Sequence, residues 1–328
     1  MSAPRTAGRT PPTRTLPPPD APAAPVRKTG RREPAGRPRR SRRGHRWFTP
    51  WLYLIAPLAF LVTFTCVPVF SLLSYSLTDW DGLSPTSAYV GLENYTELFT
   101  RPQLFRVFWV SLFYLAGSAV QIGLALYFAT VLSFNTRLRN LFKGILFFPY
   151  LINGVAIGFV FLYFFQPGGT LDTVLHWVGA GPHLWLGDPD LVNTSLAGVS
   201  VWRFMGLNMV LFIGAIQSIP AELYEAAALD GASRWQQFRH IIAPSIRPVV
   251  SLSVILAVSG ALSVFEIPYV MTGGANNSQT FVIQTIKLAF NFNKTGLASA
   301  AAVVLLVFVL LITWLQRVLF PDERVEQS

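Results

Sequence analysis

Residues 297–319 read LASAAAVVLLVFVLLITWLQRVL, a run in which Arg317 is the only charged side chain. An α-helix rises 1.5 Å per residue, so about 20 apolar residues cross the roughly 30 Å hydrocarbon core of a bilayer. Five further apolar runs of sufficient length precede this one, at 51–77, 105–134, 141–165, 191–216 and 249–271. Only helices and closed barrels span lipid, and barrel strands would alternate apolar with polar residues. The sequence therefore predicts an all-α integral membrane protein with six transmembrane helices.

The composition of the 328 residues also argues against a soluble protein. Charged residues make up 13% and hydrophobic residues 52%, whereas soluble domains carry about 25% charged residues. The net charge of +10 arises in residues 1–50, which hold 13 Lys and Arg against Asp20 and Glu33. The rest of the chain holds 13 basic and 14 acidic side chains. The basic charge thus belongs to a tail, and no nucleic-acid partner is expected.

Residues 1–46 form a Pro-, Arg- and Ala-rich tail that we expect to be disordered, because it has few apolar side chains to bury. Its charge has two open interpretations: an anchor on anionic membrane lipid, or only the signal that orients the first span. With the tail in the cytoplasm, 21 of the 26 Lys and Arg residues fall on the cytoplasmic side and 4 outside. Positive residues favour the cytoplasmic side, so both termini are expected there. The six-span domain is then expected at 47–328.

The loop at 218–248, between the fourth and fifth runs, is rich in helix signals. Pro220 and Glu222 suit a first helical turn, where a missing N–H costs nothing and an anion meets the positive helix end. Gly231 suits the left-handed conformation that ends many helices. A first short helix is therefore expected before Gly231.

A second short helix is expected after that turn. Ser233 suits its N-cap, and Gln236 completes a capping box. Pro244 is expected to end the helix and to push Ala243 out of helical geometry. Trp235 lies on a bulky apolar face that could fill a groove on a soluble partner, although the loop could also be a hairpin that merely connects two spans.

This loop resembles the EAA loop of the transmembrane permease subunits of binding-protein-dependent ABC importers. The likeness rests on six residues in the order of that family: Glu225, Ala226, Ala227, Gly231, Ile241 and Pro244. Together with Trp235, from an adjoining stretch that resembles the sugar-importing branch, they are the seven motif residues that the resemblance assigns to ATPase coupling. The chain resembles the carbohydrate branch, of the maltose and multiple-sugar type, over about 50–320. Further stretches that carry this likeness are TDWDG at 78–82, VGLENY at 90–95, WLGDP at 185–189 and TGG at 272–274.

The resemblance implies the type I ABC importer permease fold and a non-catalytic subunit that moves a mono- or oligosaccharide across the cell membrane. It implies a second permease subunit, two ATPase subunits, an extracellular solute-binding protein and surrounding membrane lipid as partners. It also implies that Glu225 anchors the loop to an ATPase and that Gly231 makes the turn. The sequence has no Gly-rich loop ending in Gly-Lys-Ser/Thr, so ATP and Mg²⁺ are expected on the partner ATPases. No catalytic residue, cofactor or metal site is expected in this chain.

Four polar residues in the spans are candidates for the substrate path: Arg203, Asn208, Glu266 and Tyr269. A charge near the bilayer centre costs roughly 2.5–3.5 kcal/mol on insertion scales, so Arg203 must face protein or water. Arg203 could donate to substrate hydroxyls, or it could form a structural ion pair with Glu266. Pro268 is expected to break the fifth helix near Glu266. A carboxylate beside aromatic rings suits a sugar there, although Glu266 could instead have a gate or packing role.

Other functions stay open at this stage. A permease for a related polar solute such as glycerol 3-phosphate would share these motifs. A secondary transporter would need several midplane carboxylates and an inverted repeat, and neither is apparent. An intramembrane enzyme that relies on histidine is disfavoured, because all four histidines lie outside the six apolar runs.

Overall fold

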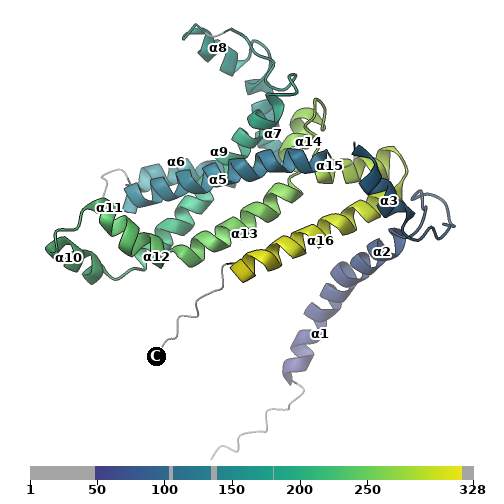
Figure 1. The fold of residues 1–328 in the computed structure, drawn as a ribbon, viewed down its shortest axis with the longest axis horizontal. Coiled ribbons are helices and arrows are strands. Elements are labelled where there is room, and N and C mark those ends of the chain that lie inside the picture. The colour runs from purple at the N-terminus through teal and green to yellow at the C-terminus, as the bar shows by residue number, and fades with distance from the viewer. Residues whose placement is uncertain (1–48, 103–105, 134–138, 180, 320–328) are drawn as a thin grey trace, which may run out of the picture. The chain divides into compact units, whose positions relative to one another are not determined.

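The computed structural model describes residues 49–102, 106–133, 139–179 and 181–319 (Figure 1). Within these residues the regular structure is helical, apart from one isolated β-bridge between Thr78 and Tyr89. The all-α prediction is confirmed for this part of the chain. The predicted disordered tail at 1–46 lies outside the described residues.

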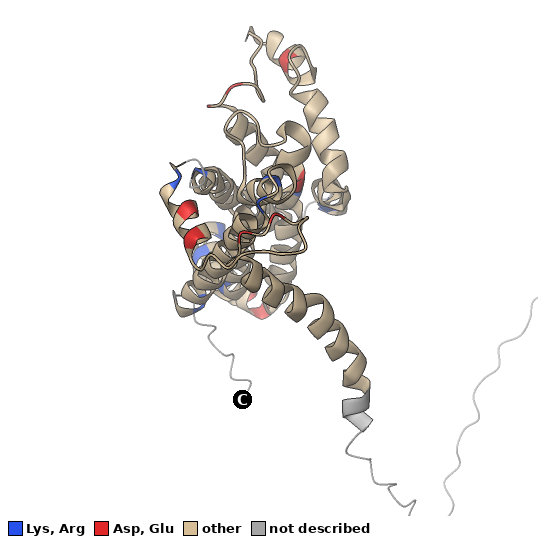
Figure 2. Cartoon of the chain, turned by 90° about the vertical axis from the view of Figure 1, so that its right-hand side faces the viewer, with Lys and Arg blue, Asp and Glu red and all other residues tan. Residues whose placement is uncertain are grey.

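Five helices in the described part are long and apolar enough to cross a membrane. They are Tyr53–Tyr75, Val107–Ser133, Val192–Gln217, Arg247–Thr272 and Thr295–Val318. In the labels of Figure 1 they correspond to α1 (Thr49–Leu61) with α2 (Val67–Tyr75), to α5 (Val107–Ser133), to α9 (Val192–Gln217), to α13 (Arg247–Ser263) with α14 (Glu266–Thr272), and to α16 (Thr295–Leu319). These helices carry few of the charged residues that are coloured in Figure 2.

The shorter helices lie at the ends of the spans or in the connections between them. They are α3 (Glu93–Thr100), α8 (Thr170–His176), α10 (Ala221–Leu229), α11 (Arg234–Gln237), α12 (Ala243–Ser245) and α15 (Phe281–Ile286). Among the described residues, three π-helical turns interrupt or extend the α-helices, at Val62–Cys66, Phe238–Ile242 and Lys287–Asn291.

The apolar run at 141–165 does not form one straight span. It folds as α6 (Arg139–Leu151) and α7 (Gly154–Phe164), which are bent by 98° relative to each other. Asn153 leaves helical geometry at ψ 138°, and its side chain accepts a hydrogen bond from the Val155 N–H, so that it caps α7. The pair is a sixth span if the two halves are taken together, and a re-entrant loop otherwise.

The fifth span is also broken, but not at the predicted residue. α13 ends at Ser263, Val264 is extended with ψ 131°, and α14 begins at Glu266. Pro268 lies in the first turn of α14, where its missing N–H leaves no helical hydrogen bond unmade. The prediction that Pro268 breaks the helix is therefore wrong, because the break precedes it.

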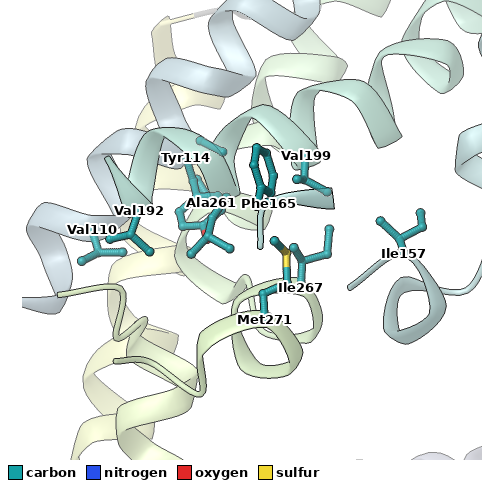
Figure 3. Packing of buried hydrophobic residues seen from close by; sticks show 11 residues of the cluster. Val110, Tyr114, Ile157, Phe165, Val192, Val199, Ala261, Ile267 and Met271 are labelled. Atoms are coloured by element: carbon teal, nitrogen blue, oxygen red, sulfur yellow. The ribbon is translucent and has the colours of Figure 1, made fainter. Parts of the chain in front are cut away.

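The core is built around α9, which packs along α5 and also contacts α6, α13 and α14. One cluster of buried apolar side chains joins α5, α9, α13 and α14 to α7 (Figure 3): Val110, Tyr114, Ile157, Phe165, Val192, Leu196, Ala197, Val199, Ala261, Ile267 and Met271. A second cluster joins α5 and the other half of α9 to the 218–248 loop, through Ile219, Ile242 and Ile246. Both ends of α9 are thus fixed by apolar packing.

Candidate functional site

A cavity of about 580 Å³ lies between α5, α9, α13 and the start of α14. Its lining combines hydroxyl and amide groups with aromatic rings. The polar members are Tyr114, Ser118, Gln121, Tyr150, Ser200, Asn208, Ser253 and Ser263, and the further aromatic members are Phe204 and Phe265. Such a lining offers hydrogen bonds and apolar faces side by side, which suits a ligand with hydroxyls on one side and C–H groups on the other.

Two charged residues line this cavity, and they pair with each other. Arg203 Nη1 donates to Glu266 Oε2 at 3.2 Å, and the Arg203 guanidinium also lies 5.0 Å from the centroid of the Phe204 ring. The Arg203 side chain is 14% exposed and that of Glu266 53%. One of the two alternatives for Arg203, the ion pair with Glu266, is therefore confirmed as a contact. The pair also leaves the cavity lining without net charge.

Three polar atoms at the cavity are buried without a hydrogen-bond partner: Tyr114 Oη, Arg203 Nε and Ser253 Oγ. An unpaired buried donor or acceptor costs about 1–3 kcal/mol, so such atoms are usually satisfied by water or a ligand. Sequence reasoning missed Tyr114 and Ser253, because a single hydroxyl in an apolar helix carries no periodic signal. Only its position beside the cavity makes it a candidate.

Asn208 and Tyr269, the other two substrate-path candidates, lie differently. Asn208 is buried and lines the cavity beside Arg203. Tyr269 does not line the cavity: its side chain is exposed, and its ring lies 4.8 Å from that of Phe265, which does. The structure thus brings Arg203, Asn208 and Glu266 together and leaves Tyr269 behind Phe265.

The first helix of the 218–248 loop ends as the sequence predicts. Gly231 has φ +74°, in the left-handed region that glycine tolerates best. The Gly231 N–H bonds the Ala228 carbonyl at 3.1 Å, and the Ala232 N–H bonds the Ala227 carbonyl at 2.9 Å. These two bonds define a Schellman motif, which satisfies carbonyls that the helix end leaves free.

The second helix begins as predicted but does not end as predicted. The Ser233 N–H donates to Gln236 Oε1, and the Gln236 N–H donates to Ser233 Oγ, so the capping box is present. Ala243, however, stays helical at φ −59°, ψ −42°. Its N–H reaches back to the Phe238 carbonyl in a π-turn, and this wider turn accommodates the proline ring at 244 without ending the helix. The predicted break at Pro244 is therefore wrong.

The loop has one face packed into the membrane helices and one face in solvent. Ile242 and Ile246 are fully buried in the cluster that contains Phe212 and Ile216 of α9. On the other face no residue of α10 is buried, and the Trp235 side chain is 67% exposed. Most of the seven motif residues, Glu225, Ala226, Gly231, Trp235 and Pro244, are exposed, while Ala227 and Ile241 are half-buried. Ala227, Gly231 and Ile241 border a hollow of about 300 Å³.

At the opposite ends of the spans, Asp172 fixes the connection between α7 and α9. Its carboxylate accepts hydrogen bonds from the Gly168 N–H, the Trp185 Nε1–H and the His183 N–H. These bonds to the charged form lower the pKa of Asp172, because they favour the carboxylate over the acid. The Asn276 side chain then donates to the Leu186 carbonyl and ties a second connection to the first.

Comparison with known proteins agrees with this architecture. Residues 121–325 match the family described as "binding-protein-dependent transport system inner membrane component", and the chain belongs to that family of multi-pass membrane proteins. It is 34% identical over 285 residues to the probable ABC transporter permease protein YurN of Bacillus subtilis, which covers 84% of this chain and 97% of YurN. It is 32% identical to the diacetylchitobiose uptake system permease protein NgcF of Streptomyces coelicolor, over 88% of each chain.

A solved structure shares the fold. A crystal structure of a bacterial alginate ABC transporter, in complex with an alginate pentasaccharide-bound periplasmic protein, contains a chain that superposes with a TM-score of 0.74. The match covers 85% of this chain and 95% of that chain, at 20% sequence identity. The predicted ABC importer permease fold is thereby confirmed.

Proposed function

We propose that this chain is the permease subunit of an ATP-driven ABC importer that carries a mono- or oligosaccharide across the cell membrane. The observation that carries the proposal is the 218–248 loop, called the coupling loop from here on. One face of its two capped helices is exposed, and the opposite face packs against the core around α9. A movement of the loop is therefore transmitted to α9, which lines the cavity. A passive connector needs neither the apolar anchor nor the exposed motif face.

The partners follow from this role. The exposed motif face suits a groove on an ATPase, where Glu225 anchors the loop and Gly231 sets the angle between its helices. Two ATPases bind ATP and Mg²⁺, one on this chain and one on a second permease subunit, and this chain is not itself a catalyst. An extracellular solute-binding protein delivers the sugar to the surface that Asp172 and Asn276 hold in place.

The cavity supplies the substrate path. Arg203, Asn208 and Glu266 are its polar contacts from the sequence analysis, and Tyr114 and Ser253 offer unpaired hydroxyls for a sugar to satisfy. Tyr269 contributes by supporting the Phe265 ring. The relative that takes up diacetylchitobiose supports a sugar as the substrate. The paired charges weigh against glycerol 3-phosphate, which would need a cation not already neutralised.

In the proposed orientation, both termini and the coupling loop lie in the cytoplasm. The tail at 1–46 then precedes a transmembrane domain at 47–328. Single cysteines at Ser84 and Asn276 should react with an impermeant thiol reagent in intact cells, in a background in which Cys66 is replaced by Ser. A cysteine at Ser233 should react only after the cells are opened. Labelling of the cysteine at position 233 in intact cells would refute both the orientation and the docking of an ATPase on the coupling loop.

The decisive experiment reconstitutes this chain in vesicles with its second permease and ATPase subunits. Sugar-loaded binding protein should stimulate ATP hydrolysis, and the labelled sugar should accumulate inside. Co-purification of the ATPase with this chain should be lost when the coupling loop is replaced by a flexible linker. Sugar uptake that proceeds without ATP would instead favour a secondary transporter.

A further inference from the structure

Gly154 lies against the ion pair at the cavity. It is the first residue of α7, directly after the bend that breaks the third span. A Cβ placed at Gly154 would stand 2.5 Å from Arg203 Nη1 and would overlap Glu266 Oε2. Both atoms are the far ends of flexible side chains, so an added methyl group would displace the ion pair and leave the backbone in place.

Gly158 continues the same contact one turn further along α7. A Cβ there would come within 2.8 Å of the Val270 side chain of α14. Residues four apart share one face of a helix, so Gly154 and Gly158 form a G-x-x-x-G face that lets α7 and α14 approach closely. Gly144, on α6 of the same broken span, has no heavy atom within 4 Å of a built Cβ.

The two helices that meet at this face each follow a break in one of the apolar runs. α7 follows the 98° bend at Asn153, and α14 follows the break at Val264. They share the core cluster of Figure 3, in which Ile157 of α7 lies with Ile267 and Met271 of α14. Glu266, the first residue of α14, then connects this pair of half-helices to Arg203 of α9.

We propose that Gly154 is a positioning residue for the Arg203–Glu266 ion pair. Gly154, Arg203 and Glu266 together form an ion-pair lock, which holds α7 and α14 against α9 at one end of the cavity. This inference rests on the proposed function, because it treats that cavity as the path of the substrate. A solute can pass that end only when the half-helices move away from α9, and this movement opens the lock. Glycine at 154 keeps the closed lock at hydrogen-bond distance.

The test is a set of variants in the reconstituted complex. Gly154→Ala should lower ATP-driven uptake by up to about fivefold, because it disturbs the same ionic contact that Arg203→Gln removes. Glu266→Asp keeps the charge but withdraws it by one methylene, so Gly154→Ala/Glu266→Asp should recover to the level of Glu266→Asp alone. Gly144→Ala is the matched control and should behave like the wild type.

The unfolding temperature of the purified complex is a second readout that needs no substrate. It should fall in Gly154→Ala, equal that of Glu266→Asp in the double variant, and not fall in Gly144→Ala, because alanine suits a helix interior better than glycine. If Gly154→Ala matches Gly144→Ala in both readouts, or if the double variant is more impaired than Glu266→Asp alone, the lock is refuted. If the unfolding temperatures follow the expected pattern while the wild type shows no stimulated ATP hydrolysis, the lock is supported and the proposed function fails.

Discussion

The coupling loop and the ion-pair lock are built over very different distances in the sequence. In the loop, the Schellman motif at Gly231 and the capping box at Ser233 join residues no more than five positions apart. In the lock, Arg203 bonds a carboxylate 63 positions away and rests against a glycine from a third helix. The turn and the caps of the loop are therefore specified by neighbouring residues, whereas the lock exists only when α7 and α14, which each follow a break, pack correctly against α9.

This difference implies that the two regions should fail in different ways. A change in the loop alters one local conformation and leaves the spans intact, so transport should be lost while the subunit still inserts. A change in the lock alters the packing of half-helices, so its effects should depend on the partner residue. Three substitutions test this comparison.

Gly231→Val should have the largest effect. Gly231 has φ +74°, where a residue with a Cβ costs about 1–2 kcal/mol and a β-branched residue more. The angle between α10 and α11 should change, and the ATP hydrolysis that is stimulated by the loaded binding protein should fall more than tenfold. Membrane levels of the subunit should stay near those of the wild type.

Gly231→Asn is the matched control, since asparagine tolerates positive φ and a built Cβ at 231 meets no atom within 4 Å. It should retain most of the stimulation. Full stimulation in Gly231→Val would show that the coupling loop is a passive connector, and the contrast between the two regions would lose its functional meaning.

Arg203→Gln should have the next largest effect. It leaves the Glu266 carboxylate without its cation, at a position that faces the cavity. Uptake should fall about fivefold, the factor that corresponds to roughly 1 kcal/mol, while the complex still assembles. Uptake and assembly of the purified complex should be measured together. Loss of assembly would mean that the pair only holds the helices together and does not serve the path.

Ser233→Ala should have the smallest effect. It removes the hydroxyl that accepts from the Gln236 N–H, and such a cap contributes about 1 kcal/mol to its helix. Stimulated ATP hydrolysis and uptake should each fall by less than about fivefold, and Ser233→Thr should restore both, because threonine is also an N-cap. A loss as large as that of Gly231→Val would indicate that Ser233 contacts the ATPase directly.

The proline residues show where sequence rules reach their limit. Proline at 244 and at 268 was expected to stop a helix, and neither does. Before Pro244 the helix widens into a π-turn, which makes room for the proline ring. A π-turn also precedes Pro68, where the Val67 N–H donates to the Val62 carbonyl. At 268 the helix has already been interrupted at Val264, so the proline lies in a first turn. Whether proline breaks a helix depends on where the preceding turn lies, and packing decides that.

The sequence by itself determined the class of protein, the number of apolar segments, and the turn at Gly231 and the capping box at Ser233 in the coupling loop. Hydropathy decides whether a segment enters lipid, and a helix cap joins residues no more than five positions apart. Both can therefore be recognised from consecutive residues of the sequence. Only the tertiary structure decided where the third and fifth apolar runs break, that Arg203 meets Glu266 beside Gly154, and that Tyr114 and Ser253 line the same cavity. In lipid, helices associate through close packing and a few polar contacts, because burial of apolar surface no longer distinguishes one face from another. Those contacts join residues far apart in sequence, and no local pattern specifies them.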